Sequence, residues 1–215
     1  MLMDPIWDLL EDQLFDRTST ECLFNMYRDR HAELDIPDAP AVRRANLRGY
    51  LLAYDRMPSV FLLVEAPGPW GARFTGVPIT SESQLLDDTF PLTGRRTSDG
   101  GDPHSEYSAR IFWRVLEPYF PAFLTWNTVP FHPHKAGKPL SIRTPAAAEI
   151  DSFESITAAF VDAIRPGHVA AIGRKAERAL DRLGVENTYV RHPSQGGAKL
   201  FEEGVTSLLH RAGIA

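Results

Sequence analysis

Short, uninterrupted apolar runs recur at four places along the chain. They cover residues 59–64, 122–126, 168–173 and, more weakly, 185–190. Runs of this length without polar alternation are typical of parallel β-strands buried on both faces. Between and after these runs, apolar positions follow helical spacing over residues 105–116, 145–164, 174–183 and 199–211. Strands that alternate with helices predict an α/β domain with a mainly parallel sheet.

The region before the first apolar run has a helical pattern instead. It predicts two short helices, over residues 4–15 and 19–27, and a third over 40–54. Proline at the first helical position supports the first of them. We expect a single domain over residues 1–215, in which 1–57 form a helical extension packed on the rest.

Composition narrows the class of protein. A chain of 215 residues with 43% hydrophobic and 24% charged residues has enough apolar surface for one folded core. No apolar run reaches the length of a membrane span, and the acidic N-terminus lacks the basic region of a secretory signal. The one cysteine, Cys22, excludes an internal disulfide. We therefore expect a cytoplasmic protein without a membrane partner.

Charge is unevenly distributed along the chain. The formal net charge of −5, taken whole, argues against a nucleic-acid binder. However, residues 1–40 carry ten acidic and three basic side chains, whereas residues 118–148 carry no acidic side chain. The second stretch contains Lys135, Lys138 and Arg143. The acidity therefore belongs to the N-terminal segment and not to the body of the chain.

Ligands of open parallel sheets bind beyond the carboxyl ends of the strands, so the loops there hold the candidate functional residues. Glu65 follows the first strand, where a carboxylate suits proton or water chemistry, although a plain strand-to-helix connection also explains it. Asn127 ends the second strand. Its amide offers a donor and an acceptor, which suits the edge of a pyrimidine, although asparagine is also a common turn residue.

Histidines follow the second and fourth strands. His132 and His134 have the spacing of a metal pair, but no third ligand is evident, so we expect no metal. His192 and Ser194 follow the fourth strand, in a loop that is equally compatible with a polar surface turn. The chain contains no G-x-S-x-G motif and no phosphate-binding G-x-x-x-x-G-K loop. The usual support for an α/β-hydrolase or a P-loop enzyme is therefore missing.

Taken together and in order, these motifs resemble the uracil-DNA glycosylase superfamily, in its Glu-Ala-Pro-Gly branch. The matching pieces are Glu65-Ala66-Pro67-Gly68, Thr75-Gly76-Val77-Pro78, Trp126-Asn127 and His192-Pro193-Ser194. Residues 105–109, 130–133 and 172–176 are also similar to bacterial members. The resemblance runs from about Val60 to Gly204. It implies a monomeric three-layer α/β/α sandwich around a four-stranded parallel sheet of order 2-1-3-4, with the N-terminal helices added.

The resemblance also implies an activity. Members extrude a damaged base from DNA and hydrolyse its N-glycosidic bond, which leaves an abasic site. By resemblance, His192 donates a hydrogen bond to uracil O2, Asn127 reads the N3 and O4 edge, and Glu65 positions the attacking water. The implied base pocket contains Ala66, Pro67, Gly68, Ile79 and Trp126. The implied DNA-binding residues are Thr80, Ser81, Arg191, Ser194, Gln195, Gly196, Gly197 and Lys199.

The chain departs from the family pattern at three positions. Ala66 stands where the most familiar members have aspartate, Val64 replaces the opening glycine, and Ile79 replaces an aromatic residue that stacks on uracil. Loss of a base stack costs about 1–3 kcal/mol. Two alternatives therefore stay open: a catalytically weak DNA-binding relative, and a glycosylase for another damaged base such as hypoxanthine.

The resemblance and the charge distribution also lead to expectations about cofactors and about the surface that meets DNA. Many relatives of this branch hold an iron–sulfur cluster through four cysteines, and the single cysteine here excludes such a cluster. No other cofactor is implied, and the expected partner is uracil-containing DNA. We expect the acidic N-terminal segment to pack away from the face that meets the DNA.

Overall fold

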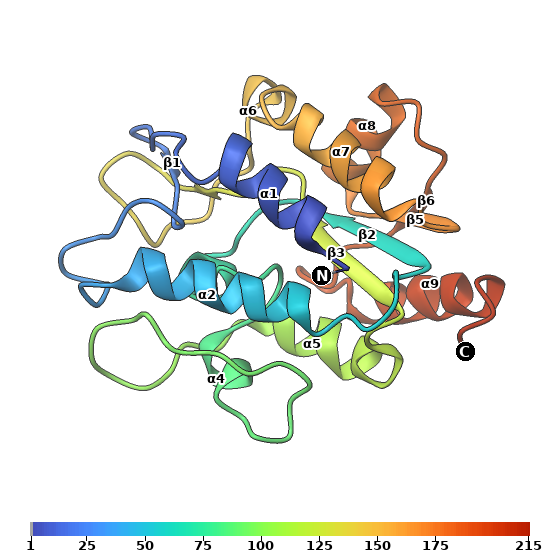
Figure 1. Cartoon of the computed structure of the whole chain (residues 1–215), viewed down its shortest axis with the longest axis horizontal. Helices are drawn as coiled ribbons and strands as arrows, with labels where there is room; N and C mark the ends of the chain where they lie inside the picture. The colour runs from blue at the N-terminus through green and yellow to red at the C-terminus, as the bar shows by residue number, and fades with distance from the viewer. Residues whose placement is uncertain (1) are drawn as a thin grey trace.

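The computed structural model describes residues 2–215. Its helices are α1 (Asp4–Gln13), α2 (Ala39–Leu52), α3 (Ala72–Thr75), α4 (Glu82–Leu85), α5 (Tyr107–Leu116), the 3₁₀ helix η1 (Glu117–Tyr119), α6 (Ala147–Asp151), α7 (Glu154–Ile164), α8 (Arg174–Arg182) and α9 (Ala198–Arg211) (Figure 1). Its strands are β1 (Leu23–Phe24), β2 (Val60–Val64), β3 (Phe123–Asn127), β4 (His132–Pro133), β5 (His168–Ile172) and β6 (Thr188–Val190).

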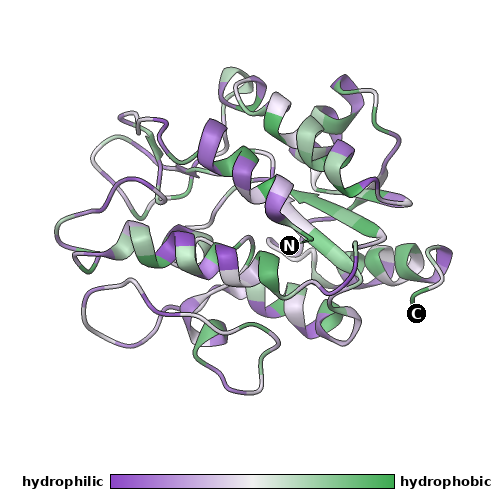
Figure 2. Ribbon diagram, in the orientation of Figure 1, coloured by the Kyte–Doolittle hydropathy of each residue, from purple (hydrophilic) through white to green (hydrophobic). Residues whose placement is uncertain are grey.

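Four of these strands form one parallel sheet of order β3-β2-β5-β6. Counted along the chain, this is the expected order 2-1-3-4, and the α/β fold class is confirmed. Every residue of β2 and β3 is buried, as their continuous apolar runs predict. Figure 2 shows both strands as hydrophobic, whereas the helices around them carry hydrophilic stretches.

Aromatic side chains hold helices against both faces of the sheet. On one face, the Phe160 ring of α7 stacks on Trp126, with ring centroids 4.5 Å apart. On the other, the Phe112 ring of α5 lies 6.0 Å from Phe123 and 5.8 Å from Phe201 of α9. Helices on both faces of a parallel sheet give the three-layer sandwich.

Helix α2 protects the open edge of the sheet at β3. The backbone N–H of Thr125 donates to the Tyr50 hydroxyl at 2.8 Å, and the Tyr54 hydroxyl donates to the carbonyl of Phe123 at 2.9 Å. These two side chains satisfy backbone groups that an edge strand otherwise leaves free for other chains. The predicted helix over 40–54 therefore forms, with bounds shifted by one or two residues.

The helix predicted over residues 19–27 is wrong. The chain instead forms β1, which pairs antiparallel with β4, so that Leu23 faces Pro133 and Phe24 faces His132. The apolar residues of this stretch meet a partner more than a hundred residues away, and that long-range pairing outweighs their local helical spacing. Figure 1 shows β1 at the end of the molecule opposite to the C-terminus.

Other predicted elements form with changed bounds. The helix predicted over 145–164 is divided into α6 and α7 by Ser152 and Phe153. The ring of Phe153 is buried against Phe131, with centroids 5.0 Å apart, which gives this interruption a packing role. The fourth strand is limited to residues 188–190. Within residues 2–215, no helix combines the length and the apolar character needed to cross a membrane.

The N-terminal segment is tied to the loop after β2 by buried polar contacts. The Tyr27 hydroxyl donates to the carbonyl of Gly76 at 2.7 Å. The Asp35 carboxylate forms ion pairs with Arg43, at 2.6 Å, and with Arg73, and all three side chains are almost fully buried. Burial raises the pKa of Asp35, but the Arg73 hydrogen bond and the Arg43 charge outweigh burial and lower it overall. One acidic residue of this segment is therefore an internal counter-charge.

Candidate active site

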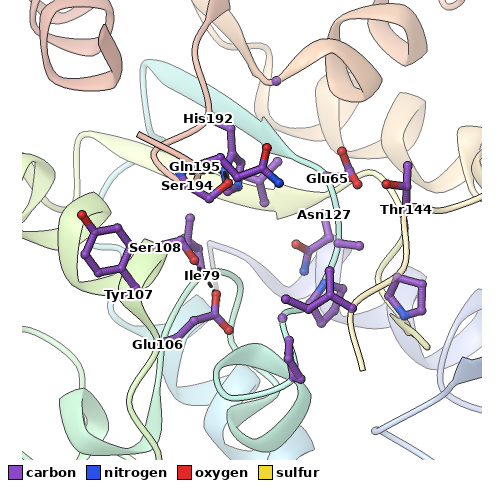
Figure 3. Close-up of a pocket in the computed structure, with 18 of the residues that line it drawn as sticks. Glu65, Ile79, Glu106, Tyr107, Ser108, Asn127, Thr144, His192, Ser194 and Gln195 are labelled. Atoms are coloured by element: carbon purple, nitrogen blue, oxygen red, sulfur yellow. Dashed lines mark hydrogen bonds between the residues drawn. The ribbon is translucent and has the colours of Figure 1, made fainter. Parts of the chain in front are cut away.

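A pocket of about 690 Å³ lies at the carboxyl ends of the parallel strands. The register of the sheet places Val64 opposite Asn127, so Glu65 and Asn127 emerge side by side at its edge. The Thr128 N–H donates to the carbonyl of Val64 at 2.7 Å and fixes this junction. Figure 3 shows Glu65, Asn127 and His192 around the same space, although they lie at the ends of three different strands.

The Asn127 amide is a buried and unused hydrogen-bonding group. The residue is 1% exposed, and neither Nδ2 nor Oδ1 has a partner among the described residues. A buried polar group without a partner costs about 1–3 kcal/mol, so such groups need a reason to be retained. Because Asn127 lines the pocket, a ligand that offers both an acceptor and a donor satisfies it.

His192 is a neutral hydrogen-bond donor at the opposite wall. Burial, with help from the nearby Arg191 charge, lowers its pKa to about 4. The backbone N–H of Ser194 donates to Nδ1 at 3.2 Å, and the Ser194 hydroxyl lies 2.8 Å from the same atom. A backbone N–H can only donate, so Nδ1 is the acceptor and the ring proton is on Nε2. His192 can therefore donate from Nε2 to a ligand without carrying charge.

Glu65 is the carboxyl group at the tip of β2, next to Ala66. It is half-buried, and this burial raises its pKa, while the positive charge of Lys175 opposes the rise. A carboxyl with a raised pKa in a pocket is a candidate for proton or water chemistry. Ala66 supplies no polar side chain, so Glu65 is the carboxyl group that this loop brings to the pocket.

The side chains of Thr80 and Ser81, the expected phosphate ligands, are bonded within the fold. Both are completely buried. The Thr80 hydroxyl lies 3.0 Å from the carbonyl of Pro78 and accepts from Trp113 Nε1, and Ser81 caps α4 through Gln84. Ile79, just before them, has a positive φ of 45°. Both hydroxyls therefore form hydrogen bonds within the fold, and the structure does not support contacts from them to phosphate.

The other expected site residues either line the pocket or lie outside it. Those that line the pocket are Ala66, Pro67, Gly68, Ile79, Arg191, Ser194 and Gln195. Trp126 does not line the pocket, because its buried side chain packs toward α7 and stacks on Phe160. The residues that lie beyond the pocket wall are Gly196, Gly197 and Lys199. Lys199 is highly exposed and forms a long ion pair with Glu203, at 3.8 Å, a geometry that contributes little to stability.

Glu106 is a pocket residue whose role the sequence did not reveal. It lies at the start of α5, and the Ser108 hydroxyl donates to its Oε1 at 2.5 Å. Burial raises the pKa of this carboxyl. Figure 3 places Glu106 and Ser108 on the wall across from Glu65 and Thr144. Glu106 lies within residues 105–109, which resemble the family. A carboxylate inside such a stretch is the sequence feature that could have marked it as a pocket residue.

The two histidines after β3 have structural partners. His132 is 1% exposed, with Nδ1 2.8 Å from the carbonyl of Pro67 and Nε2 3.1 Å from that of Pro139. Burial lowers its pKa to about 4. His134 stacks beside it, with ring centroids 5.8 Å apart. In residues 2–215, no three His, Cys, Asp or Glu side chains converge as metal ligands do.

The fold and the pocket define an α/β protein with a ligand site at the carboxyl ends of its parallel strands. A family model of the uracil DNA glycosylase superfamily matches residues 53–214. The chain belongs to this superfamily. A crystal structure of wild-type SMUG2 from Pedobacter heparinus is similar in fold, with a TM-score of 0.67, 14% sequence identity and coverage of 100% of this chain and 99% of that chain. A comparison with curated protein sequences finds no match.

Family membership supports a DNA glycosylase, which is a hydrolase acting on DNA. The N-terminal segment lies outside the matched range, yet the similarity in fold extends over it. None of the residues that line the pocket comes from described residues before 58.

Proposed function

We propose that the chain is a monofunctional uracil-DNA glycosylase, which extrudes uracil from DNA and hydrolyses its N-glycosidic bond. The observation that carries this proposal is the buried, unpartnered amide of Asn127. The N3–H of uracil is a donor and its O4 an acceptor, so the amide oxygen and nitrogen are both satisfied by that edge. Cytosine presents an acceptor and a donor in the reverse order, so it pairs with this amide only if the amide is turned over.

Bond cleavage needs stabilisation of the departing base. As the bond from the sugar breaks, negative charge develops on uracil, and a donor aimed at O2 lowers the energy of that state. His192 fits this role, because its neutral ring carries the proton on Nε2. A neutral donor strengthens its hydrogen bond as charge develops, without attracting anions beforehand.

Water must then attack the sugar. Glu65 lies at the strand tip beside Asn127, where its carboxylate can orient a water molecule and accept its proton. The proton moves from the water to Glu65, and the oxygen forms the new bond to the sugar carbon as the base departs. Ala66 provides no competing group, so this task falls to Glu65.

A second candidate function is excision of a larger deaminated base such as hypoxanthine. The observation that favours it is the size of the pocket, about 690 Å³, together with Ile79 in place of a stacking aromatic ring. A branched aliphatic side chain constrains the plane of the base less than a ring does. This candidate uses the same His192 donor.

The deciding experiment is an alkaline-cleavage assay on oligonucleotides that carry one uracil, one hypoxanthine or only ordinary bases. Strand breaks at uracil support the proposal, and breaks at hypoxanthine alone support the second candidate. Asn127→Asp should lose at least about tenfold of uracil excision, because its carboxylate cannot donate to O4. Binding to uracil-containing DNA without product over long incubation would identify a catalytically weak relative.

A further inference from the structure

Exposed apolar side chains gather at the mouth of the pocket. Three of the large apolar side chains with substantial exposure line it: Trp70 at 41%, Tyr107 at 58% and Ile142 at 76%. Single exposed apolar residues are normal on a protein surface, but a group around one opening marks a contact surface. Ile142 has the greatest exposure among the large apolar side chains of the described chain.

The loop that carries Ile142 is anchored on both sides of it. Ser141 donates to the carbonyl of Lys138 at 2.7 Å and accepts from the Lys135 N–H at 2.8 Å. Arg143 pairs with both oxygens of Glu149, at 2.8 and 2.7 Å, and donates to the carbonyl of Cys22 at 2.7 Å. Because these contacts fix the backbone on both sides, the 76% exposed side chain of Ile142 is held at the rim.

The charge around Ile142 indicates what it meets. Lys135 and Lys138 are exposed on the same loop, and residues 118–148 contain no acidic side chain. The Arg143 charge is balanced by Glu149. A surface with free cations around an apolar tip fits a partner that is anionic outside and apolar inside. Duplex DNA has this composition, with phosphates outside and stacked bases within.

We propose that Ile142 is a wedge residue that enters the base stack of duplex DNA beside the extruded nucleotide. This inference rests on the proposed function of the same pocket. Figure 3 shows Thr144, two residues beyond Ile142, on the opposite side of the pocket from Tyr107. An apolar side chain inserted at a base step partly unstacks it and replaces the contacts that the extruded base loses. The wedge is needed only when the target base starts within a stacked duplex.

The test compares excision of uracil from duplex and single-stranded oligonucleotides. Ile142→Ala should lower the duplex rate by about tenfold or more and leave the single-strand rate within about twofold, because an unpaired strand needs no wedge. Ile142→Leu should retain the duplex rate. Leu86→Ala is the matched control, since Leu86 is 44% exposed and lies away from the pocket.

A second measurement follows extrusion without chemistry. Fluorescence of 2-aminopurine placed beside uracil in a duplex should rise on binding of the unaltered chain and rise less with Ile142→Ala. An equal loss on both substrates, or no loss on either, contradicts the wedge. If the unaltered chain excises no uracil at all, the proposed function fails, and the fluorescence difference alone supports or overturns the wedge.

Discussion

The carboxyl group of Glu106 fills the space that a side chain at Gly68 would occupy. A β-carbon built on Gly68 would lie 2.6 Å from the carboxyl carbon, and one on Gly71 would lie 2.9 Å from it. Real β-carbons do not approach other atoms so closely. A side chain at either glycine would therefore have to displace the Glu106 carboxyl, which is packed against this loop.

Gly68→Ala should displace either Glu106 or the loop from Pro67 to Gly71. We expect excision to fall by up to about a hundredfold, because a shift of an ångström in a reacting group has an effect of this order. The fold should survive, since the pocket can widen. Steady-state excision and thermal unfolding measured together check this. Gly49→Ala is the control, because its β-carbon would be 3.9 Å from the nearest atom. Full activity of Gly68→Ala would argue against close packing of the two groups.

His192→Ala should reduce the rate of the chemical step by about 10²–10³, the usual effect of removing a donor to a developing anion. Ser194→Ala should have a smaller effect of the same kind. The Ser194 hydroxyl lies 2.8 Å from Nδ1, and it helps to keep the proton on Nε2. Single-turnover excision separates this step from binding. Unchanged single-turnover rates in His192→Ala would overturn the proposed donor role.

Excision should depend on the ionisation of Glu65. Burial raises the pKa of its folded-state carboxyl, so the carboxylate is lost at a higher pH than from an ordinary glutamate. If the carboxylate positions water, the rate is highest above that pKa and falls as pH decreases through it. Glu65→Gln should have a lower maximal rate and lack this fall. An unaltered pH profile in Glu65→Gln would exclude Glu65 as the base.

Asp35→Asn should destabilise the fold strongly. The carboxylate balances two buried guanidinium groups, Arg43 and Arg73, and breaking a buried ion pair from one side costs about 3–5 kcal/mol. Denaturant unfolding measures this loss. Asp38→Asn is the matched control, because Asp38 is exposed and 3.6 Å from Arg95, a geometry worth about 0–1 kcal/mol. Equal effects of the two substitutions would mean that burial of the cluster contributes nothing.

The sheet and most helices were predictable because their signals are local. A continuous apolar run such as that of β2 has few alternatives to a buried strand, and the loop residues at strand ends then follow from topology. Glu65, Asn127 and His192 were found in this way. The order of the strands came from the family resemblance, since periodicity contains no information about which strands are neighbours.

The clearest differences from the sequence predictions involve contacts between distant parts of the chain. β1 forms through its pairing with β4, the Thr80 hydroxyl accepts from Trp113 of α5, and the Trp126 ring stacks on Phe160 of α7. Glu106 acquires its place from the loop that packs onto it, some forty residues earlier. The sequence around either residue does not predict such a contact, because the partner lies in a distant part of the chain.

The contact between Arg143 and the carbonyl of Cys22 has a consequence for where this protein can be divided. Sequence similarity to the family begins at residue 53, yet the earlier segment supports the Ile142 loop and supplies Asp35 to two buried arginines. A chain shortened to the matched range would lose the support of the Ile142 loop and would leave Arg73 buried without its counter-charge, since Asp35 and Arg43 are both removed. The range that matches the family by sequence is therefore shorter than the range on which the fold depends. Only the longer range shows which residues must stay in one chain.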